Sequence, residues 1–379
     1  MDFTHTDDRR MLADTIARFV REDYTFEHRL EIGASEPGFS SDVWARFAEL
    51  GLIGALFSED DGGFGGAGFD LAVVFEELGK GLVVEPFLPT LIAGRIIAAA
   101  GTDDQKAIVD SVIAGEILIS FAHGEPEGRY GLADVSLTAE RQDGGFALNG
   151  MKSVVPIGRS ADRFVVSARS HGAMGDDNGL SLLLVDGEAD GLTRRGYPTI
   201  DGGGAADLTF DNVSVPAEAL IGEEGKAFSI MEAGTGLGLL ALSAEALGVM
   251  EAAKSMTLDY LGTRKQFGRA IGAFQALQHR MAELLVEIEQ MRSAVINAAG
   301  ALEGDATARE MALSSAKYLA GKVGRLVAEE TIQMHGGIGM TWEYALPHYA
   351  KRLIMIDHVL GDEDHHLARY IALSRDGQS

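Results

Sequence analysis

Two short segments carry residue types that can hold a phosphate-bearing ligand. The first is Arg264-Lys265-Gln266-Phe267-Gly268, and the second, about seventy residues later, is Gln333-Met334-His335-Gly336-Gly337-Ile338-Gly339-Met340. An arginine presents a fork of N–H donors that can hold a pyrophosphate through two hydrogen bonds. Two adjacent glycines let backbone N–H groups approach anionic oxygens with no side chain in between. The alternative interpretation is a buried helix followed by a tight loop.

The composition is that of an enzyme-sized protein. At 379 residues, 46% of them apolar, the chain allows two or three domains and a large core. Its longest apolar run is far shorter than the ~20 residues of a membrane span, and its start lacks the features of a secretory signal. The absence of cysteine excludes disulfides, thiolate metal sites and thiol catalysis. We therefore expect a cytoplasmic protein with no membrane partner.

The formal net charge of −25 argues against a nucleic-acid partner, because phosphate binding needs a positive surface. The field of the whole chain repels anions. Any ligand phosphate must therefore be met by local arginines, lysines or backbone amides.

The spacing of apolar residues predicts three successive regions, which together make an α+β chain. Apolar residues recur at three- and four-residue spacings at first, which predicts helices within residues 1–118. Short runs rich in Val, Leu and Phe then predict an antiparallel β-barrel or sandwich domain over residues 119–222. Residues 223–379 are predicted to form an antiparallel four-helix bundle. Its helices are expected at Met231–Tyr260, Phe274–Leu302, Ala306–Met334 and Tyr344–Ile371.

This α–β–α order, with the two segments above, resembles the acyl-CoA dehydrogenase family over essentially the full length. Shorter matches to the family pattern are Leu52-Ile53-Gly54, Asp61-Gly62-Gly63, Glu125-Pro126, Asp211-Asn212-Val213-Ser214-Val215-Pro216 and Gly225-Lys226-Ala227-Phe228. The resemblance is closest to the small subunits of pimeloyl-CoA dehydrogenases, through Lys152-Ser153-Val154-Val155 and Gly361-Asp362-Glu363-Asp364-His365-His366-Leu367-Ala368-Arg369. It implies α,β-dehydrogenation of an acyl-CoA thioester with FAD as cofactor. It also implies electron-transfer flavoprotein or a similar acceptor as a partner.

The resemblance assigns the binding of the FAD pyrophosphate and adenine to six residues, which we call the FAD clamp: Arg264, Phe267, Gln275, Gln333, Gly336 and Gly337. In this family such a clamp serves the FAD that is seated mainly in the neighbouring subunit. The clamp is therefore expected to be donated across a dimer interface.

The flavin-ring pocket departs from the family pattern. The family usually has Trp-Ile-Thr after its Gly-x-Lys turn, and this chain has Val154-Val155-Pro156 there. Valine offers no ring to stack, and proline has neither a hydroxyl nor an N–H group. The Thr-Glu-Pro segment has become Gly124-Glu125-Pro126. We expect these to be ordinary β-strand residues without a cofactor role.

The carboxylate base is missing from both positions that the family uses. On the first bundle helix the glutamate position falls on Gly238, and a neighbouring substrate-site arginine falls on Leu239. Near the C-terminus the position falls within residues 360–362, where Asp362 is one methylene shorter than glutamate, and a misplacement of ~1 Å can cost roughly a hundredfold in rate. Glu245 lies about two turns, or ~10 Å, beyond Gly238 and would act only on a differently placed acyl chain. Asp362 and Glu245 are the candidate catalytic residues, and a structural role is the alternative for Glu245.

Five histidines raise the question of a metal site: His335, His348, His358, His365 and His366. Adjacent histidines on a helix point about 100° apart and do not converge on one ion. Acidic residues beside them are explained by a solvated helix N-terminus. No metal site is predicted.

Three hypotheses follow. The first is one half of a hetero-oligomer, arranged α2β2, in which a second acyl-CoA dehydrogenase subunit supplies the base and the flavin-ring pocket. The second is a self-sufficient homotetramer with Asp362 or Glu245 as an unconventional base. The third is a flavin-free scaffold subunit. The small-subunit resemblance favours a dicarboxylyl- or ring-bearing acyl-CoA, or a steroid side chain, as the substrate.

Overall fold

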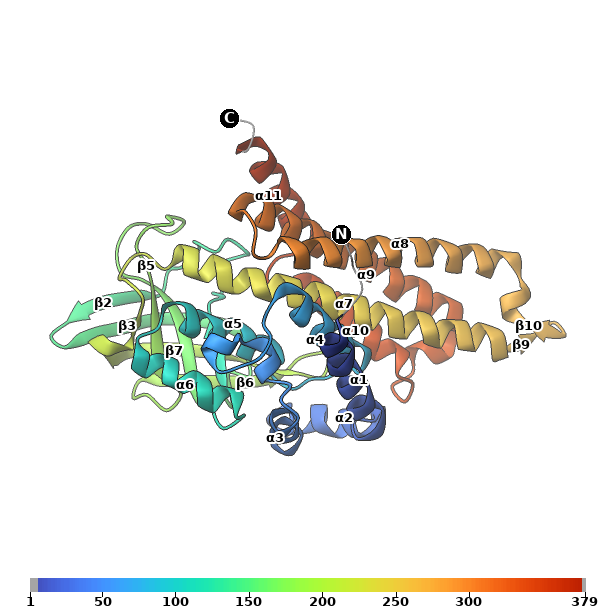
Figure 1. Cartoon of the computed structure of the whole chain (residues 1–379), viewed down its shortest axis with the longest axis horizontal. Helices are drawn as coiled ribbons and strands as arrows, with labels where there is room; N and C mark the ends of the chain where they lie inside the picture. Colours follow the sequence, from blue (N-terminus) through green and yellow to red (C-terminus); the bar gives the residue numbers. More distant parts are fainter. Residues whose placement is uncertain (1–5, 377–379) are drawn as a thin grey trace. The chain divides into compact units, whose positions relative to one another are not determined.

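The computed structural model describes residues 6–376, and the chain folds as two compact units (Figure 1). The helical unit contains the described residues up to Arg29, then Ala67–Val83, then Leu239 onward. The mixed unit contains Leu30–Gly66 and Val84–Gly238. Helix α2 (Phe26–Ala34) contributes to both units.

The helical unit is a bundle of long helices. They are α1 (Asp7–Glu22), α4 (Gly68–Lys80), most of α7 (Phe228–Thr263), α8 (Gln275–Ala301), α9 (Ala306–His335), α10 (Leu346–His358) and α11 (Glu363–Asp376). Helices α7 and α8 are joined at one end by a hairpin of β9 (Lys265–Gln266) and β10 (Arg269–Ala270), seen at the tip of the bundle in Figure 1. Helix α9 packs against α8, α10 and α11.

Helix α7 is the core helix of this bundle. Its 36 residues are long and apolar enough to cross a membrane, but 89% of its most apolar stretch is buried inside the protein. Helices that are hydrophobic on all sides are typical of the interior of a large protein. The burial accounts for its composition without a membrane.

Glycines let α4 approach α7 at backbone distance. A Cβ atom built on Gly79 would lie 2.2 Å from the carbonyl oxygen of Glu245, and one built on Gly248 would lie 1.9 Å from that of Glu76. Neither distance leaves room for a side chain. The two helices therefore pack backbone against backbone at these positions.

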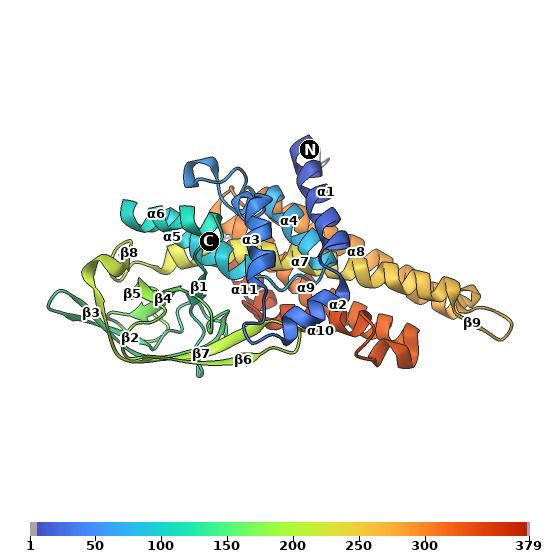
Figure 2. The ribbon, with the colours of Figure 1, turned by 90° about the horizontal axis from the view of Figure 1, so that it is seen from below.

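The mixed unit combines three helices with one sheet. The helices are α3 (Ser41–Glu49), α5 (Phe87–Ala100) and α6 (Asp103–Ile113). The strands are β1 (Ile119–Ala122), β2 (Thr138–Gln142), β3 (Gly145–Pro156), β4 (Arg163–Arg169), β5 (Leu180–Asp186), β6 (Leu192–Pro198), β7 (Gly204–Pro216) and β8 (Leu220–Ile221). Their order is β6-β7-β3-β2-β4-β5-β8, with β1 also paired to β4, and Figure 2 shows β2, β3 and β7 side by side.

The predicted helix–sheet–helix order is present, and three details of the prediction are wrong. Segment Tyr344–Ile371 is not one helix, because the chain turns between α10 and α11 where Leu360 and Gly361 have φ angles of 58° and 111°. The sheet is not purely antiparallel, since β1 and β4 pair in parallel. Helices α5 and α6 lie within residues 1–118, where helices were predicted, but neither was predicted as a separate helix.

A buried ion pair joins β3 to the loop after β1. Lys152 and Glu125 lie 2.8 Å apart with side chains 0% and 3% exposed. The Lys152 ammonium also donates to the carbonyl of His123 and to the hydroxyl of Ser167, each at 3.0 Å. Burial lowers the pKa of Lys152 to about 8, although the charge of Glu125 opposes this. Burial alone would raise the pKa of Glu125, but Lys152 and hydrogen bonds to the carboxylate lower it overall.

We expect Glu125→Gln to lower the free energy of unfolding by about 3–5 kcal/mol, because Lys152 is left buried without its carboxylate. Urea or thermal unfolding measures the loss. Since the folded-state pKa of Glu125 is lowered, the contribution of the pair is present above the unfolded value near 4.5 and is lost as pH falls through the folded-state pKa. The control is Glu224→Gln, which breaks an exposed pair with Arg141 and should cost less than about 1 kcal/mol. Equal losses in the two variants would contradict this account.

Candidate functional site

The β9–β10 hairpin displays an aromatic ring in solvent. Phe267 and Gly268 have φ angles of 54° and 78°, as expected for the type I′ turn of a two-residue hairpin. A positive φ is unfavourable for a residue with a Cβ atom. The Phe267 ring is nevertheless 91% exposed, with one edge contact to Phe274 at 6.1 Å between centroids. A strained turn that holds a large apolar ring in solvent is typical of a surface that another molecule completes.

Arg264 is available for a ligand. Its backbone N–H donates to the carbonyl of Tyr260 at 2.8 Å, and its side chain is exposed. Between residues 6 and 376 no acidic side chain lies within ion-pair distance of Arg264, Lys265 or Arg269. In a chain of net charge −25, these three cations within six residues form a local positive site. The described structure therefore gives Arg264 no surface ion pair that would occupy its guanidinium.

The backbone at Gly336 and Gly337 is open. Gly336 ends α9 with φ 66° and ψ −140°, a conformation that essentially only glycine adopts. A Cβ atom built on Gly337 would meet no other atom within 4 Å. No packing within the described chain requires glycine at 337. The bare backbone instead leaves room for a molecule from outside the chain.

The structure brings all six clamp residues to one end of the bundle. The Tyr260 ring, one turn before Arg264, stacks on the His335 ring, which directly precedes Gly336, with centroids 4.4 Å apart. At the start of α8, a Cβ atom on Gly272 would lie 2.9 Å from the carbonyl oxygen of Leu261, so this segment packs against the end of α7. Gln275 follows three residues later, and Gln333 lies in the last turn of α9. Both glutamine side chains are exposed.

His335 is a structural residue rather than a metal ligand. It is buried, and its Nδ1 donates to the carbonyl of Thr331 at 2.9 Å. The hydroxyl of Tyr344 lies 3.3 Å from its Nε2. Burial lowers the pKa of His335 below its usual value. Sequence reasoning missed Tyr260 and Tyr344, and the only available signal was the one-turn spacing between Tyr260 and Arg264.

Apolar side chains continue from the clamp along the loop after α9. Met340 is 76% exposed and Trp342 is 60% exposed. The ammonium of Lys351 lies 4.1 Å from the centre of the Trp342 ring. Exposed apolar groups next to a ligand-binding end mark an interaction surface.

Glu245 is occupied by a buried ion pair. It is 6% exposed, and Arg352 holds both of its oxygens, with Nε donating to Oε1 at 2.6 Å and Nη2 donating to Oε2 at 2.8 Å. A bidentate pair of this kind fixes the carboxylate in one orientation. A general base needs a carboxylate oxygen within reach of the substrate. The geometry therefore favours the structural role of Glu245.

Asp362 caps a helix. Its Oδ1 accepts the backbone N–H of His365 at 2.9 Å, which is the arrangement of an N-cap at the start of α11. The preceding turn is held from inside by Lys317, which donates to the carbonyls of Asp357 and Gly361. Burial lowers the pKa of Lys317 to about 8, against the charges of Asp357 and Asp362. His366 donates to the carbonyl of Leu360 at 3.0 Å, so the turn is fixed on several sides.

The strand segment expected to lack a cofactor role forms a strained bulge. Val154 has φ 52°, is 57% exposed, and lies where the register between β3 and β7 shifts. Its N–H donates to Asp207 at 3.4 Å, and Pro156 is exposed beside it. The N–H of Ser153 donates to the carbonyl of Gly124 at 2.7 Å. Neither an aromatic ring nor a hydroxyl is offered by Val154 or Pro156.

Sequence reasoning missed His123 in this part of the mixed unit. Its ring stacks on Phe121 with centroids 5.3 Å apart, and its Nδ1 lies 3.0 Å from the hydroxyl of Ser167. Ser167 also accepts from the buried Lys152. His123 therefore ends a chain of polar contacts that begins at the buried ion pair.

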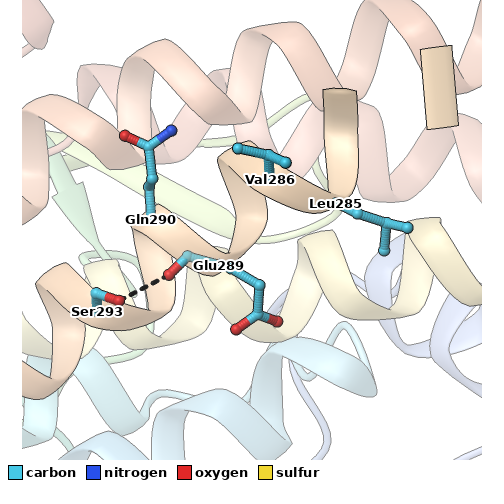
Figure 3. Close-up of a pocket in the computed structure, with 5 residues that line it drawn as sticks. All are labelled: Leu285, Val286, Glu289, Gln290 and Ser293. Carbon is cyan, nitrogen blue, oxygen red and sulfur yellow. Dashed lines mark hydrogen bonds between the residues drawn. The ribbon is translucent and has the colours of Figure 1, made fainter. Parts of the chain in front are cut away.

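Two other features of the described chain do not form a catalytic site. No group of three or more His, Asp or Glu residues within 6–376 is placed to hold a metal ion. A groove of about 450 Å³ lies along α8, and Figure 3 shows the residues that line it. Its lining is Leu285, Val286, Glu289, Gln290 and Ser293. All five residues come from one helix, and the ion-pair partner of Glu289 is Arg292 on the same helix, 3.5 Å away.

Known families match consecutive parts of the chain. Residues 6–116 match "Acyl-CoA dehydrogenase, N-terminal domain", residues 120–213 match the middle domain, and residues 228–369 match the C-terminal domain. The chain belongs to the acyl-CoA dehydrogenase family. The fold, the oxidoreductase class and the family cofactor FAD expected from the resemblance are thereby confirmed.

Individual relatives agree. The long-chain specific acyl-CoA dehydrogenase of Mus musculus mitochondria is 30% identical, over 88% of this chain and 78% of its own length. A variant of the Tcur3481–Tcur3483 steroid acyl-CoA dehydrogenase has a TM-score of 0.89 at 30% identity, covering 98% of this chain and 99% of that one. The ChsE4–ChsE5 complex from Mycobacterium tuberculosis has a TM-score of 0.90 at 25% identity, covering 99% of each chain.

The clamp end fits the dinucleotide half of FAD. Arg264 offers a guanidinium with no ion-pair partner among residues 6–376, and Gly336 and Gly337 offer bare backbone where a Cβ atom would meet no described atom within 4 Å. Both features suit a pyrophosphate, which needs charge and close approach. The flavin-ring segment at Val154–Pro156 fits less well, because it supplies neither a stacking ring nor a hydrogen-bonding hydroxyl.

Arg264→Ala is expected to weaken FAD binding tenfold to a hundredfold, because a hydrogen bond to a charged group typically contributes about 1.5–3 kcal/mol. Flavin absorbance and FAD titration measure it in whichever assembly retains FAD. Arg269→Ala separates the general charge of the local positive site from the clamp contact: Arg269 is not one of the six clamp residues and lies over the Phe274 ring, so its loss should weaken binding by less than about threefold. Equal FAD affinity in the Arg264 variant and the wild type would make Arg264 a surface residue without cofactor contact.

Proposed function

We propose that this chain is the subunit of a hetero-oligomeric acyl-CoA dehydrogenase that donates the FAD clamp and lacks a catalytic base of its own. The second subunit supplies the base and the flavin-ring pocket. The assembly holds one FAD per heterodimer and is arranged α2β2. Bound FAD would supply the hydride acceptor for the β-hydrogen of the acyl group, and the clamp residues of this chain would hold its dinucleotide half.

One contrast carries the proposal. The polar clamp side chains of Arg264, Gln275 and Gln333 are exposed and have no hydrogen-bond or ion-pair partner within the described chain, whereas both candidate carboxylates are already engaged. Arg352 occupies both oxygens of Glu245, and the N-terminus of α11 occupies Asp362. A self-sufficient enzyme needs the opposite arrangement at its base. The geometry therefore favours the asymmetric assembly over the homotetramer.

The names of the structural relatives support an assembly of two different chains. Both the Tcur3481–Tcur3483 enzyme and the ChsE4–ChsE5 complex are named for two components. The resemblance of Gly361–Arg369 to the small subunits of pimeloyl-CoA dehydrogenases supports the same arrangement. We take the exposed ring of Phe267 and the apolar side chains of Met340 and Trp342 as part of the surface that meets the second subunit.

The substrate follows as a ring-bearing acyl-CoA, with a steroid side chain as the first choice, because the relative at 30% identity is named a steroid acyl-CoA dehydrogenase. Dicarboxylyl-CoA is the second choice. Electron-transfer flavoprotein, or a similar carrier, is the proposed acceptor. A structural neighbour at 28% identity is named for the electron transferring flavoprotein of Acidaminococcus fermentans.

Purified alone, the chain is expected to retain little FAD, and co-expression with its partner should raise occupancy towards one FAD per two chains. The flavin-to-protein absorbance ratio of the purified assemblies measures this. A stoichiometric flavin spectrum from the lone chain, with turnover of an acyl-CoA, would establish the homotetramer instead. An assembly that binds FAD equally well with Arg264→Ala in this chain would leave it a scaffold.

Asp362→Asn and Glu245→Gln should each leave the rate of flavin reduction by substrate within about tenfold, because neither carboxylate takes the proton. Loss of a true general base typically costs ~10²–10⁴-fold. Anaerobic flavin reduction isolates the chemical step in the assembled enzyme. Asparagine caps a helix as well as aspartate, so Asp362→Asn should also preserve stability, whereas Asp362→Ala should cost about 1 kcal/mol. A hundredfold slower step with FAD still bound would make this subunit catalytic.

A further inference from the structure

We infer that Tyr260 is a positioning residue for the FAD clamp, acting through its stack on His335. The inference rests on the proposed function, because it assumes that the clamp holds FAD. We propose no direct contact between Tyr260 and the cofactor. Its effect on FAD is indirect, through the spacing between Arg264 and the Gly336–Gly337 backbone.

The two halves of the clamp come from helices far apart in sequence. Arg264 is tied to the last turn of α7 by its N–H bond to the carbonyl of Tyr260, and Gly336 directly follows His335. The rings of Tyr260 and His335 are nearly parallel, at 21° and 4.4 Å between centroids. The stack thus links the end of α7 that carries Arg264 to the end of α9 that leads into Gly336. A bidentate site for a pyrophosphate tolerates little change in this spacing.

The His335 side of the stack is held from several directions. Nδ1 donates to the carbonyl of Thr331, and the Tyr344 ring lies 5.5 Å away with its hydroxyl near Nε2. A Cβ atom on Gly339 would lie 2.9 Å from the Cβ of His335, so the turn after α9 folds back onto the histidine. His335 is therefore the fixed member of the pair. Tyr260 transmits that position to the end of α7.

The hydroxyl of Tyr260 makes no contribution to the proposed positioning. The ring faces His335, and the contact of its two π-systems depends on shape and not on the hydroxyl. Phenylalanine at position 260 would preserve the ring stack on His335, whereas leucine would remove it. This difference separates positioning from any direct hydrogen bond between the Tyr260 hydroxyl and a ligand.

The experiment measures FAD affinity in the assembly that retains FAD, together with the melting temperature of the same samples. Tyr260→Leu is expected to weaken FAD binding about fivefold to tenfold, and Tyr260→Phe by less than about twofold. Tyr318→Leu is the matched control, because Tyr318 is a half-buried tyrosine on α9 that lies 17 residues, or ~25 Å, from His335. It should leave FAD affinity unchanged even if it lowers the melting temperature as much as Tyr260→Leu.

A double-mutant cycle with Arg264→Ala completes the test. If Tyr260 acts through Arg264, Tyr260→Leu should weaken FAD binding by less than about twofold more once Arg264 is gone. Full additivity of the two changes would overturn the inference, as would equal effects of Tyr260→Leu and Tyr318→Leu on FAD affinity. If Arg264→Ala alone left FAD affinity unchanged, the proposed function itself would be wrong.

Discussion

Backbone-to-backbone packing of α7 on α4 is the constraint on which the helical unit depends. Gly79 and Gly248 leave no space between the two helices, so α7 lies in the interior and carries Glu245 with it. An unpaired carboxylate in such a place costs several kcal/mol, and Arg352 removes that cost by holding both oxygens. Close helix packing at these two glycines therefore buries Glu245 and accounts for its structural role. The same packing leaves both oxygens of Glu245 bound by Arg352.

Glycines of the helical unit fall into two physical kinds, and the distinction separates structure from function. At Gly79 and Gly248 a Cβ atom would overlap a neighbouring backbone, so the protein's own packing requires glycine. At Gly337 the same atom would meet nothing, so the requirement comes from outside the chain. Charged side chains show the same distinction between a partner within the chain and a partner from outside it. Lys152 is satisfied within the mixed unit, whereas Arg264 has no acidic partner within the described chain.

Apolar periodicity predicted the succession of helical, β and helical regions, because it reports which faces must be buried. It missed α5, which is apolar almost all the way round and so shows no helical period. It also passed over the turn between α10 and α11, where Gly361 adopts a positive φ within a helix-like pattern. Residue types at fixed spacing predicted the six clamp residues, which the structure places at one end of the helical unit. The partners of Glu245 and Asp362 could not be read, because Arg352 lies 107 positions away from Glu245 and an N-cap appears only once the helix start is known.

The clamp residues and the positions where the family would place its base are far apart along one rigid element. Leu239, where the family would place an arginine, and Tyr260, which stacks beneath the clamp, lie 21 residues apart on α7. A helix rises 1.5 Å per residue, so ~32 Å separates them. Substitutions that far apart with no shared partners act independently. Selection can therefore keep the Tyr260–His335 stack, Gly336, Gly337 and Arg264 at the clamp end. Toward the other end of α7, Gly238 and Leu239 can at the same time occupy the positions of the family's glutamate and arginine. An assembly of two different subunits is the arrangement in which such a division costs no activity.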